Sequence, residues 1–63
     1  MKRNNTILVV DEEILDIKII KRIFSNDYEI IVADNEKKAF SIMVSRYNEI
    51  AAILYDFTML KTD

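Results

Sequence analysis

Short apolar runs alternate along this chain with stretches in which apolar residues recur at helical spacing. Ile7–Val10 is an unbroken aliphatic run, which predicts a strand buried on both faces and favours a parallel sheet. From Glu13 to about Ser25 the apolar positions follow a helical period. They cover an arc of roughly 200°, wider than the ~100° stripe of an ordinary surface helix. We therefore expect a helix whose apolar side is too wide for one sheet face and stays partly exposed.

The second half of the chain repeats this order. Tyr28–Ala33 predicts a second strand, and "ADNEKKAF" opens a second helix with Asp34 or Asn35 as its N-cap. After "YNE", the run "IAAILYD" predicts a third strand that ends at Asp56. The order β-α-β-α-β predicts an α/β fold, with parallel strands, right-handed crossovers and helices on the faces. The second helix has a narrower apolar stripe, which consists of Ala39, Phe40, Met43, Val44 and Tyr47.

Composition excludes several classes of function. The chain has 63 residues, a net charge of −2, no histidine and no cysteine. A zinc site and catalysis by Ser-His or Cys-His pairs are therefore excluded. The charge does not favour a nucleic-acid partner, and no apolar run is long enough to span a membrane. We expect one small cytoplasmic domain over residues 1–63 that is not an enzyme in its own right.

Two of the predicted strands end on a carboxylate, Asp11 in "ILVVDEE" and Asp56 in "ILYDFTML". Ligands of open parallel sheets bind outside the carboxyl ends of the strands, where the strand order reverses. With a strand order of 2-1-3, that point lies between the strands that end at Asp11 and Asp56, and Glu12 follows directly. Clustered carboxylates repel one another unless a proton or a cation lies among them, and oxygen ligands are those that Mg²⁺ prefers. Asp11 taken singly could equally be a cap for the following helix.

These residues resemble the receiver domain of two-component response regulators. "ILVVDEE" is similar to the first strand and acidic pair of that family, and "VADNEKKAF" resembles the exit from its second strand. "AAILYDFTMLKTD" resembles the strand that bears the phospho-acceptor aspartate. The resemblance runs from Ile7 to Asp63 and covers the first half of the family's domain. It implies a truncated receiver-like domain, the β-α-β-α-β half of a flavodoxin-like doubly wound parallel sheet.

The resemblance also implies a role for each acid. Asp56 would accept a phosphoryl group from a sensor histidine kinase or a phosphotransfer protein, in phosphorelay signal transduction. Glu12 and Asp56 would ligate Mg²⁺ directly, and Asp11 would hold it through water. The backbone carbonyl of Thr58 would complete the protein ligands.

The alternative function is that of a half-receiver that takes no phosphate and acts as a self-association or protein-interaction module. In the order 2-1-3 the third strand is an edge, although Ile53, Leu54 and Tyr55 are typical of an interior strand. An apolar edge invites pairing with another chain. A core of this size rarely supplies more than about 3–5 kcal/mol. We therefore predict a homodimer with the third strand or the first helix at its centre.

Overall fold

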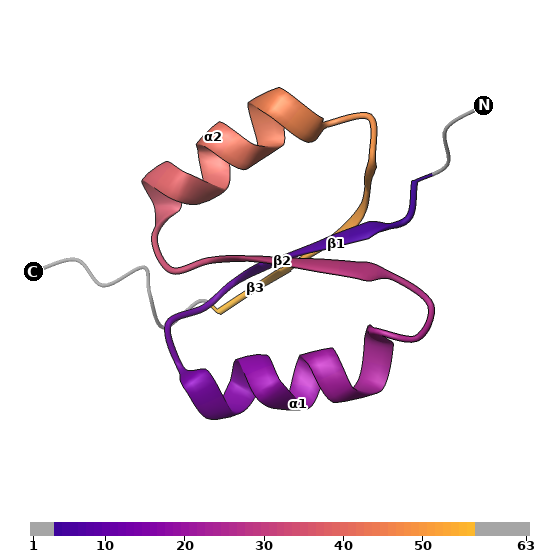
Figure 1. Ribbon diagram of the computed structural model, residues 1–63. Helices are drawn as coiled ribbons and strands as arrows, with labels where there is room; N and C mark the ends of the chain where they lie inside the picture. Colours follow the sequence, from indigo (N-terminus) through magenta and orange to yellow (C-terminus); the bar gives the residue numbers. More distant parts are fainter. Residues whose placement is uncertain (1–3, 57–63) are drawn as a thin grey trace, which may run out of the picture.

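The computed structural model describes residues 4–56 and contains three strands and two helices in the predicted order (Figure 1). The ends of the first two strands and of the first helix lie within one residue of the predicted ends. No helix among the described residues is both long and apolar enough to cross a membrane. The elements are β1 (Thr6–Val10), α1 (Ile14–Phe24), β2 (Glu29–Ala33), α2 (Glu36–Arg46) and β3 (Ile50–Tyr55).

The strands form one parallel sheet in the order β2-β1-β3. Leu8 in the central strand lies opposite Ile31 on one side and Ile53 on the other. The pairing of β1 with β3 is irregular only between Thr6 and Ile7. The predicted α/β class and strand order are confirmed, and they correspond to half of a flavodoxin-like sheet.

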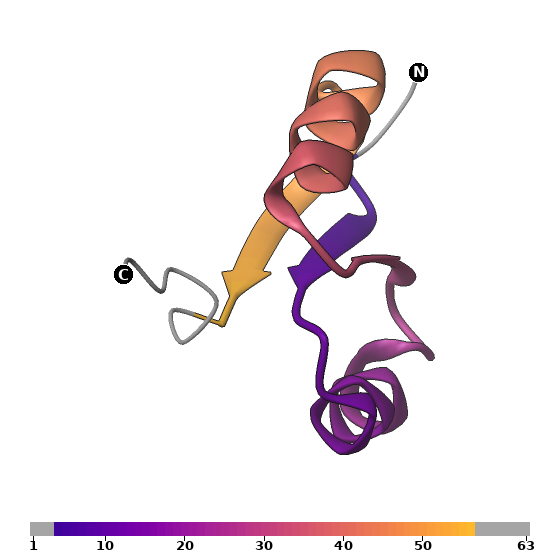
Figure 2. The ribbon, with the colours of Figure 1, turned by 90° about the vertical axis from the view of Figure 1, so that its left-hand side faces the viewer.

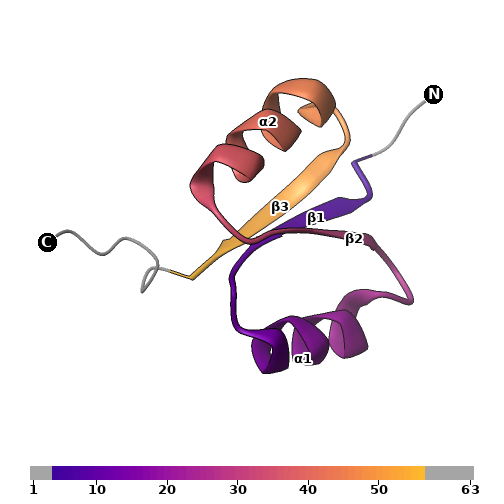
Figure 3. The same cartoon turned by 60° about the vertical axis from the view of Figure 1, so that its left-hand side comes forward.

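The two helices cover opposite faces of the sheet (Figures 1 and 2). The connections from β1 to β2 and from β2 to β3 run in opposite directions across the sheet, so crossovers of the same hand place their helices on opposite faces. α1 packs against β2, and α2 packs against β1 and β2. Seen from a third direction, α1 and α2 again stand on either side of the strands (Figure 3). Both helices therefore concentrate on the β2 side of the sheet, and β3 receives little cover from either.

The core lies around β1, in which every residue is buried, as the unbroken apolar run predicts. Leu8 and Val10 face α2 and pack with Ala33 and Ala39. α1 contributes no fully buried residue. The prediction of a partly exposed first helix is confirmed, because one sheet face cannot cover so wide an apolar arc. Its exposed apolar residues include Ile14, Leu15, Ile19 and Ile23.

The beginning of α2 shows which of two candidate residues caps the helix. The side chain of Asn35 accepts a hydrogen bond from the backbone N–H of Lys38 at 2.8 Å, so Asn35 is the N-cap. Asp34 instead pairs with the Lys38 ammonium group at 3.3 Å. The bond from the Lys38 N–H to Asn35 satisfies one of the N–H groups that a helix start leaves without an intrahelical partner.

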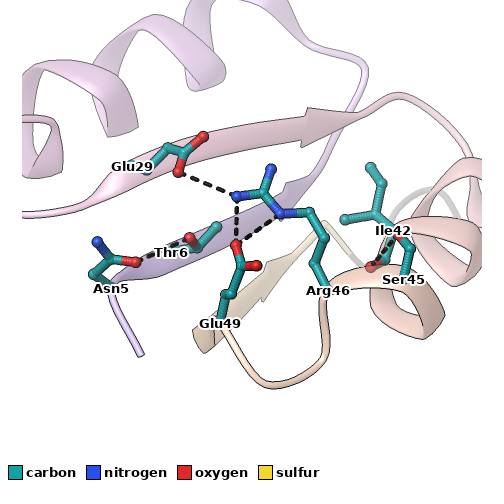
Figure 4. Close-up of polar contacts among 7 residues, drawn as sticks. All are labelled: Asn5, Thr6, Glu29, Ile42, Ser45, Arg46 and Glu49. Carbon is teal, nitrogen blue, oxygen red and sulfur yellow. Dashed lines mark hydrogen bonds and ion pairs between the residues drawn. The ribbon is translucent and has the colours of Figure 1, made fainter. Parts of the chain in front are cut away.

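Arg46, the last residue of α2, ties three elements together at the amino ends of the strands (Figure 4). Its Nη2 atom lies 2.6 Å from Oε1 of Glu49 and 3.2 Å from Oε1 of Glu29. The hydrogen bond to Glu49 is the main reason that the pKa of Arg46 is raised. One guanidinium group thus joins the end of α2 to the residue before β3 and to the first residue of β2.

Candidate metal centre

Asp11 is held at the carboxyl end of β1 by both its backbone and its side chain. Its N–H donates to the carbonyl of Ala33 at 3.0 Å, which continues the ladder to β2. Its side chain is buried, and Oδ1 accepts a hydrogen bond from the N–H of Glu13 at 2.8 Å. Asp11 therefore does stabilise the turn before α1. A carboxylate has two oxygens with several lone pairs, so this bond leaves capacity for a cation.

Asp11, Asp16 and Asp56 bring their carboxylates together at one end of the sheet. One oxygen from each residue can be chosen so that all three atoms lie within 4.8 Å of one another. Asp56 follows β3 and is fixed by its own N–H, which donates to the carbonyl of Val10 at 2.9 Å. Asp16 reaches the group from the first turn of α1. The three side chains line a cavity of about 280 Å³, whose other walls are Ile19, Ile20, Leu54 and Tyr55.

The spacing of these oxygens fits a hard divalent cation. Mg²⁺ binds oxygen at about 2.1 Å, so ligands on opposite sides of the ion stand roughly 4.2 Å apart. For Ca²⁺, at about 2.3–2.6 Å, the same separation is roughly 4.6–5.2 Å. Only one of the three pairs can lie on opposite sides of an octahedral ion, and neighbouring Mg²⁺ ligands stand about 3.0 Å apart. The three oxygens therefore lie within reach of one ion, but some pairs need to approach each other by up to about 1.8 Å. Rotation of the exposed Asp16 side chain can supply part of this approach.

The structure brings together two of the acids predicted from the sequence, Asp11 and Asp56. Glu12 is not a member of the group and instead lines a neighbouring cavity of about 400 Å³ beside Lys38. Its role as a direct ligand stays a prediction. Thr58 lies outside the described residues. The sequence analysis did not identify Asp16 as a candidate ligand. The signal that could have identified it is that this acid interrupts the apolar arc of the first helix only five residues after Asp11.

Tyr55, the residue before Asp56, connects the site to the other helix. Its hydroxyl group donates a hydrogen bond to the carboxylate of Glu36, in the first turn of α2. This hydrogen bond raises the pKa of Tyr55, and partial burial adds to the effect. The end of β3 is therefore anchored to α2 directly beside the candidate metal centre.

Comparison with protein-family models, with curated proteins and with solved structures gave no significant match to this chain.

Proposed function

We propose that this protein is a receiver-type phospho-acceptor domain, or the N-terminal part of one, and that Asp56 takes the phosphoryl group. The observation that carries the proposal is the group formed by Asp11, Asp16 and Asp56. It stands at the carboxyl ends of β1 and β3, the two neighbouring strands between which the strand order reverses. Ligands of open parallel sheets bind at this position. The resemblance of the sequence to receiver domains supports the same function.

The reaction needs a positioned oxygen nucleophile and a neutralised phosphoryl group. A carboxylate oxygen of Asp56 attacks the phosphorus of a phosphohistidine, so that a P–O bond forms while the P–N bond breaks. The bonding electron pair leaves on the imidazole nitrogen, which takes up a proton. Asp11 and Asp16 would hold Mg²⁺ beside Asp56, with Glu12 as a further candidate ligand. When bound, the ion would neutralise negative charge on the transferring phosphoryl group.

The fixed backbone around Asp56 supports its role as nucleophile. The Asp56 N–H bond to Val10 and the Tyr55 bond to Glu36 both restrain the chain on the N-terminal side of the Asp56 Cα atom. Restraint of this kind reduces the entropy lost when the acceptor oxygen meets the phosphorus. The donor would be a sensor histidine kinase or a phosphotransfer protein in the cytoplasm, and the domain itself would be a stoichiometric acceptor rather than an enzyme.

Phosphorylation by a small phosphodonor tests this function without the natural kinase. We expect incubation with acetyl phosphate and Mg²⁺ to add one phosphoryl group to the intact protein, as measured by mass spectrometry. Asp56→Asn should abolish the gain in mass, and removal of Mg²⁺ with a chelator should slow it strongly. Asp27→Asn, in the turn after α1, is the matched control and should leave the modification unchanged. A gain in mass that persists in Asp56→Asn contradicts the assignment of the acceptor.

A second candidate function is self-association, as a homodimer that works as an interaction module. The observation that favours it is the amount of apolar surface left exposed on a chain with so small a core. Ile14 and Leu15 in α1 are 66% and 65% exposed, and Phe40 in α2 is 66% exposed. Small domains without disulfides often gain stability by oligomerisation. Sedimentation at micromolar concentration tests this candidate, and a folded monomer at every concentration would contradict it.

A further inference from the structure

A hydrogen bond between Tyr55 and Glu36 joins the end of β3 to the beginning of α2. Tyr55 is the last residue of β3, and Glu36, 19 residues earlier in the chain, is the first residue of α2. The Tyr55 hydroxyl group donates to the Glu36 carboxylate, and a bond to such a charged group is about twice as strong as one between neutral groups. The bond is also the main reason that the pKa of Tyr55 is raised. The hydroxyl group therefore keeps at neutral pH the proton that it donates.

This bond completes a closed set of contacts, the contact ring, around the carboxyl ends of the three strands. Two links of the ring are backbone hydrogen bonds, from the N–H of Asp56 to β1 at 2.9 Å and from the N–H of Asp11 to β2 at 3.0 Å. The third link is the Tyr55 bond to α2, and short stretches of chain connect the three. In order, the members are Asp56, Val10, Asp11, Ala33, Glu36 and Tyr55. Both acids that the sequence predicted at this edge are therefore held in one ring.

The stretch of chain that leads from β2 to Glu36 is itself fixed by local contacts. Asn35 accepts the N–H of Lys38 at 2.8 Å, which sets the start of α2. Asp34 pairs with the ammonium group of the same lysine at 3.3 Å. Glu36 follows in the first turn of α2, where the helix dipole favours an anion. The carboxylate that holds Tyr55 thus stands on a backbone whose position relative to β2 is determined.

Tyr55 and Asp56 lie on opposite faces of the sheet, since successive side chains along a strand alternate between its faces. The aromatic side chain of Tyr55 packs against the core on the α2 face, where Ala39 is buried. Asp56 shares its cavity with Leu54, two residues earlier, and with Asp16 from α1, which covers the other face (Figure 2). The Tyr55 hydroxyl group therefore acts on Asp56 only through the backbone that the two residues share.

We propose that Tyr55 and Glu36 are positioning residues for Asp56, and that their hydrogen bond sets the distance between the carboxylates of Asp56 and Asp11 from the opposite face of the sheet. The inference rests on the proposed phosphoryl transfer to Asp56 and adds two residues to it. The N–H bond of Asp56 alone is a single attachment about which the end of β3 can turn. A second attachment, one residue earlier and on the other face, removes that freedom, so the acceptor loses less entropy on reaching the phosphorus.

The rate of phosphorylation by acetyl phosphate at saturating Mg²⁺, measured against donor concentration, tests this role. Tyr55→Phe keeps the aromatic side chain in the core and removes only the hydroxyl group. We expect the maximum rate constant to fall about ten-fold with little change in the half-saturating donor concentration, because a displacement of 1 Å can cost about 100-fold in rate. Glu36→Ala should give the same loss, and the double variant no further loss, since both remove one bond. Glu36→Gln retains an acceptor oxygen and should recover part of the rate.

Two controls separate position from stability. Arg46→Met removes the contacts of α2 with Glu29 and Glu49 at the opposite ends of the strands. It should lower the urea midpoint and leave the rate of phosphorylation unchanged. Tyr47→Phe removes the hydroxyl group of a tyrosine that is 76% exposed and should change neither quantity.

Binding of Mg²⁺ alone, measured by titration calorimetry, reads the position of Asp56 without a phosphodonor. We expect the dissociation constant to rise at least about three-fold in Tyr55→Phe, less than the about 10–100-fold lost with a residue bonded directly to a ligand, because Tyr55 acts through the backbone. Arg46→Met should bind Mg²⁺ as the native chain does.

The two measurements distinguish failure of this inference from failure of the proposed function. Phosphorylation of Tyr55→Phe at the native rate, or an equal loss of rate in Arg46→Met, would overturn the positioning role and leave Asp56 as the acceptor. If the native chain takes up no phosphoryl group, phosphoryl transfer is overturned and Mg²⁺ affinity decides: a weaker affinity in Tyr55→Phe supports the positioning role, and an unchanged one overturns it. A native chain that takes up no phosphoryl group and binds no Mg²⁺ overturns both.

Discussion

Binding of Mg²⁺ to the three aspartates should raise the melting temperature of the protein, and the size of the effect can be worked out. At a Mg²⁺ concentration ten times the dissociation constant, binding to the folded state alone stabilises it by about 1.4 kcal/mol. The entropy of unfolding is about 2.1 cal/mol/K per residue, or roughly 0.13 kcal/mol/K for 63 residues. The expected rise in Tm is therefore about 10 °C. Such a shift is large because the domain is small.

Removal of one ligand should reduce this shift in a predictable way. Asp56→Asn removes one of three negative charges from the site, and we expect the dissociation constant for Mg²⁺ to rise at least about ten-fold. Even the loss of a residue that only supports a metal ligand typically lowers metal affinity by about 10–100-fold. At the same Mg²⁺ concentration the stabilisation then falls to about 0.4 kcal/mol and the shift to roughly 3 °C. Without metal, the variant should melt no lower than the native chain, because one repulsive charge is gone.

Thermal unfolding followed by circular dichroism, at one fixed protein concentration, measures these shifts. Asp27→Asn is the matched control, since Asp27 lies in the turn between α1 and β2 at the other end of the sheet. Asp16→Asn and Glu12→Gln compare the ligand that the structure brings into the group with the one expected from the sequence. An equal Mg²⁺ shift in the native chain and in Asp56→Asn would refute the assignment of the metal centre.

Three further predictions concern the stability of the fold. Leu8→Ala should cost about 2–5 kcal/mol and abolish cooperative urea unfolding, because Leu8 is 0% exposed and the whole core supplies about 3–5 kcal/mol; its control Leu15→Ala should unfold like the native chain. Asn35→Ala should cost about 1 kcal/mol in urea unfolding through the lost N-cap bond, and retention of full stability would contradict the capping role. The pKa of Tyr55 is raised in the folded state, so the folded protein holds the hydroxyl proton more tightly than the unfolded chain does. This stabilisation of the folded state is complete below the unfolded pKa of about 10 and is lost as the pH rises through the folded pKa. Urea midpoints measured across that range should fall less steeply in Tyr55→Phe than in the control Tyr47→Phe.

The pattern of apolar and acidic positions along the chain was enough to predict the order of the elements and the end of the sheet at which the acids lie. The unbroken run Ile7–Val10 predicts a strand buried on both faces, and every residue of that run is buried in the structure. Parallel strands present their carboxyl ends at the same edge, so Asp11 and Asp56 were expected at one edge of the sheet, and the order β2-β1-β3 brings them together there. Local hydrogen bonding gave two candidates for the second helix cap, and Asn35 is one of them.

Which third acid joins the group, and which apolar residues are covered, depends on how the helices pack against the sheet. Because α1 begins at Ile14, Asp16 lies in its first turn and lines the same cavity as Asp11 and Asp56. Glu12 lies before the helix and lines the neighbouring cavity. Periodicity marks the apolar side of a helix but not the strands on which it rests. α2 rests on β1 and β2, so Ala39 is buried while Tyr47 beside β3 stays exposed. Burial depends on contacts between residues far apart in the chain, and the apolar stripe of one helix does not contain that information.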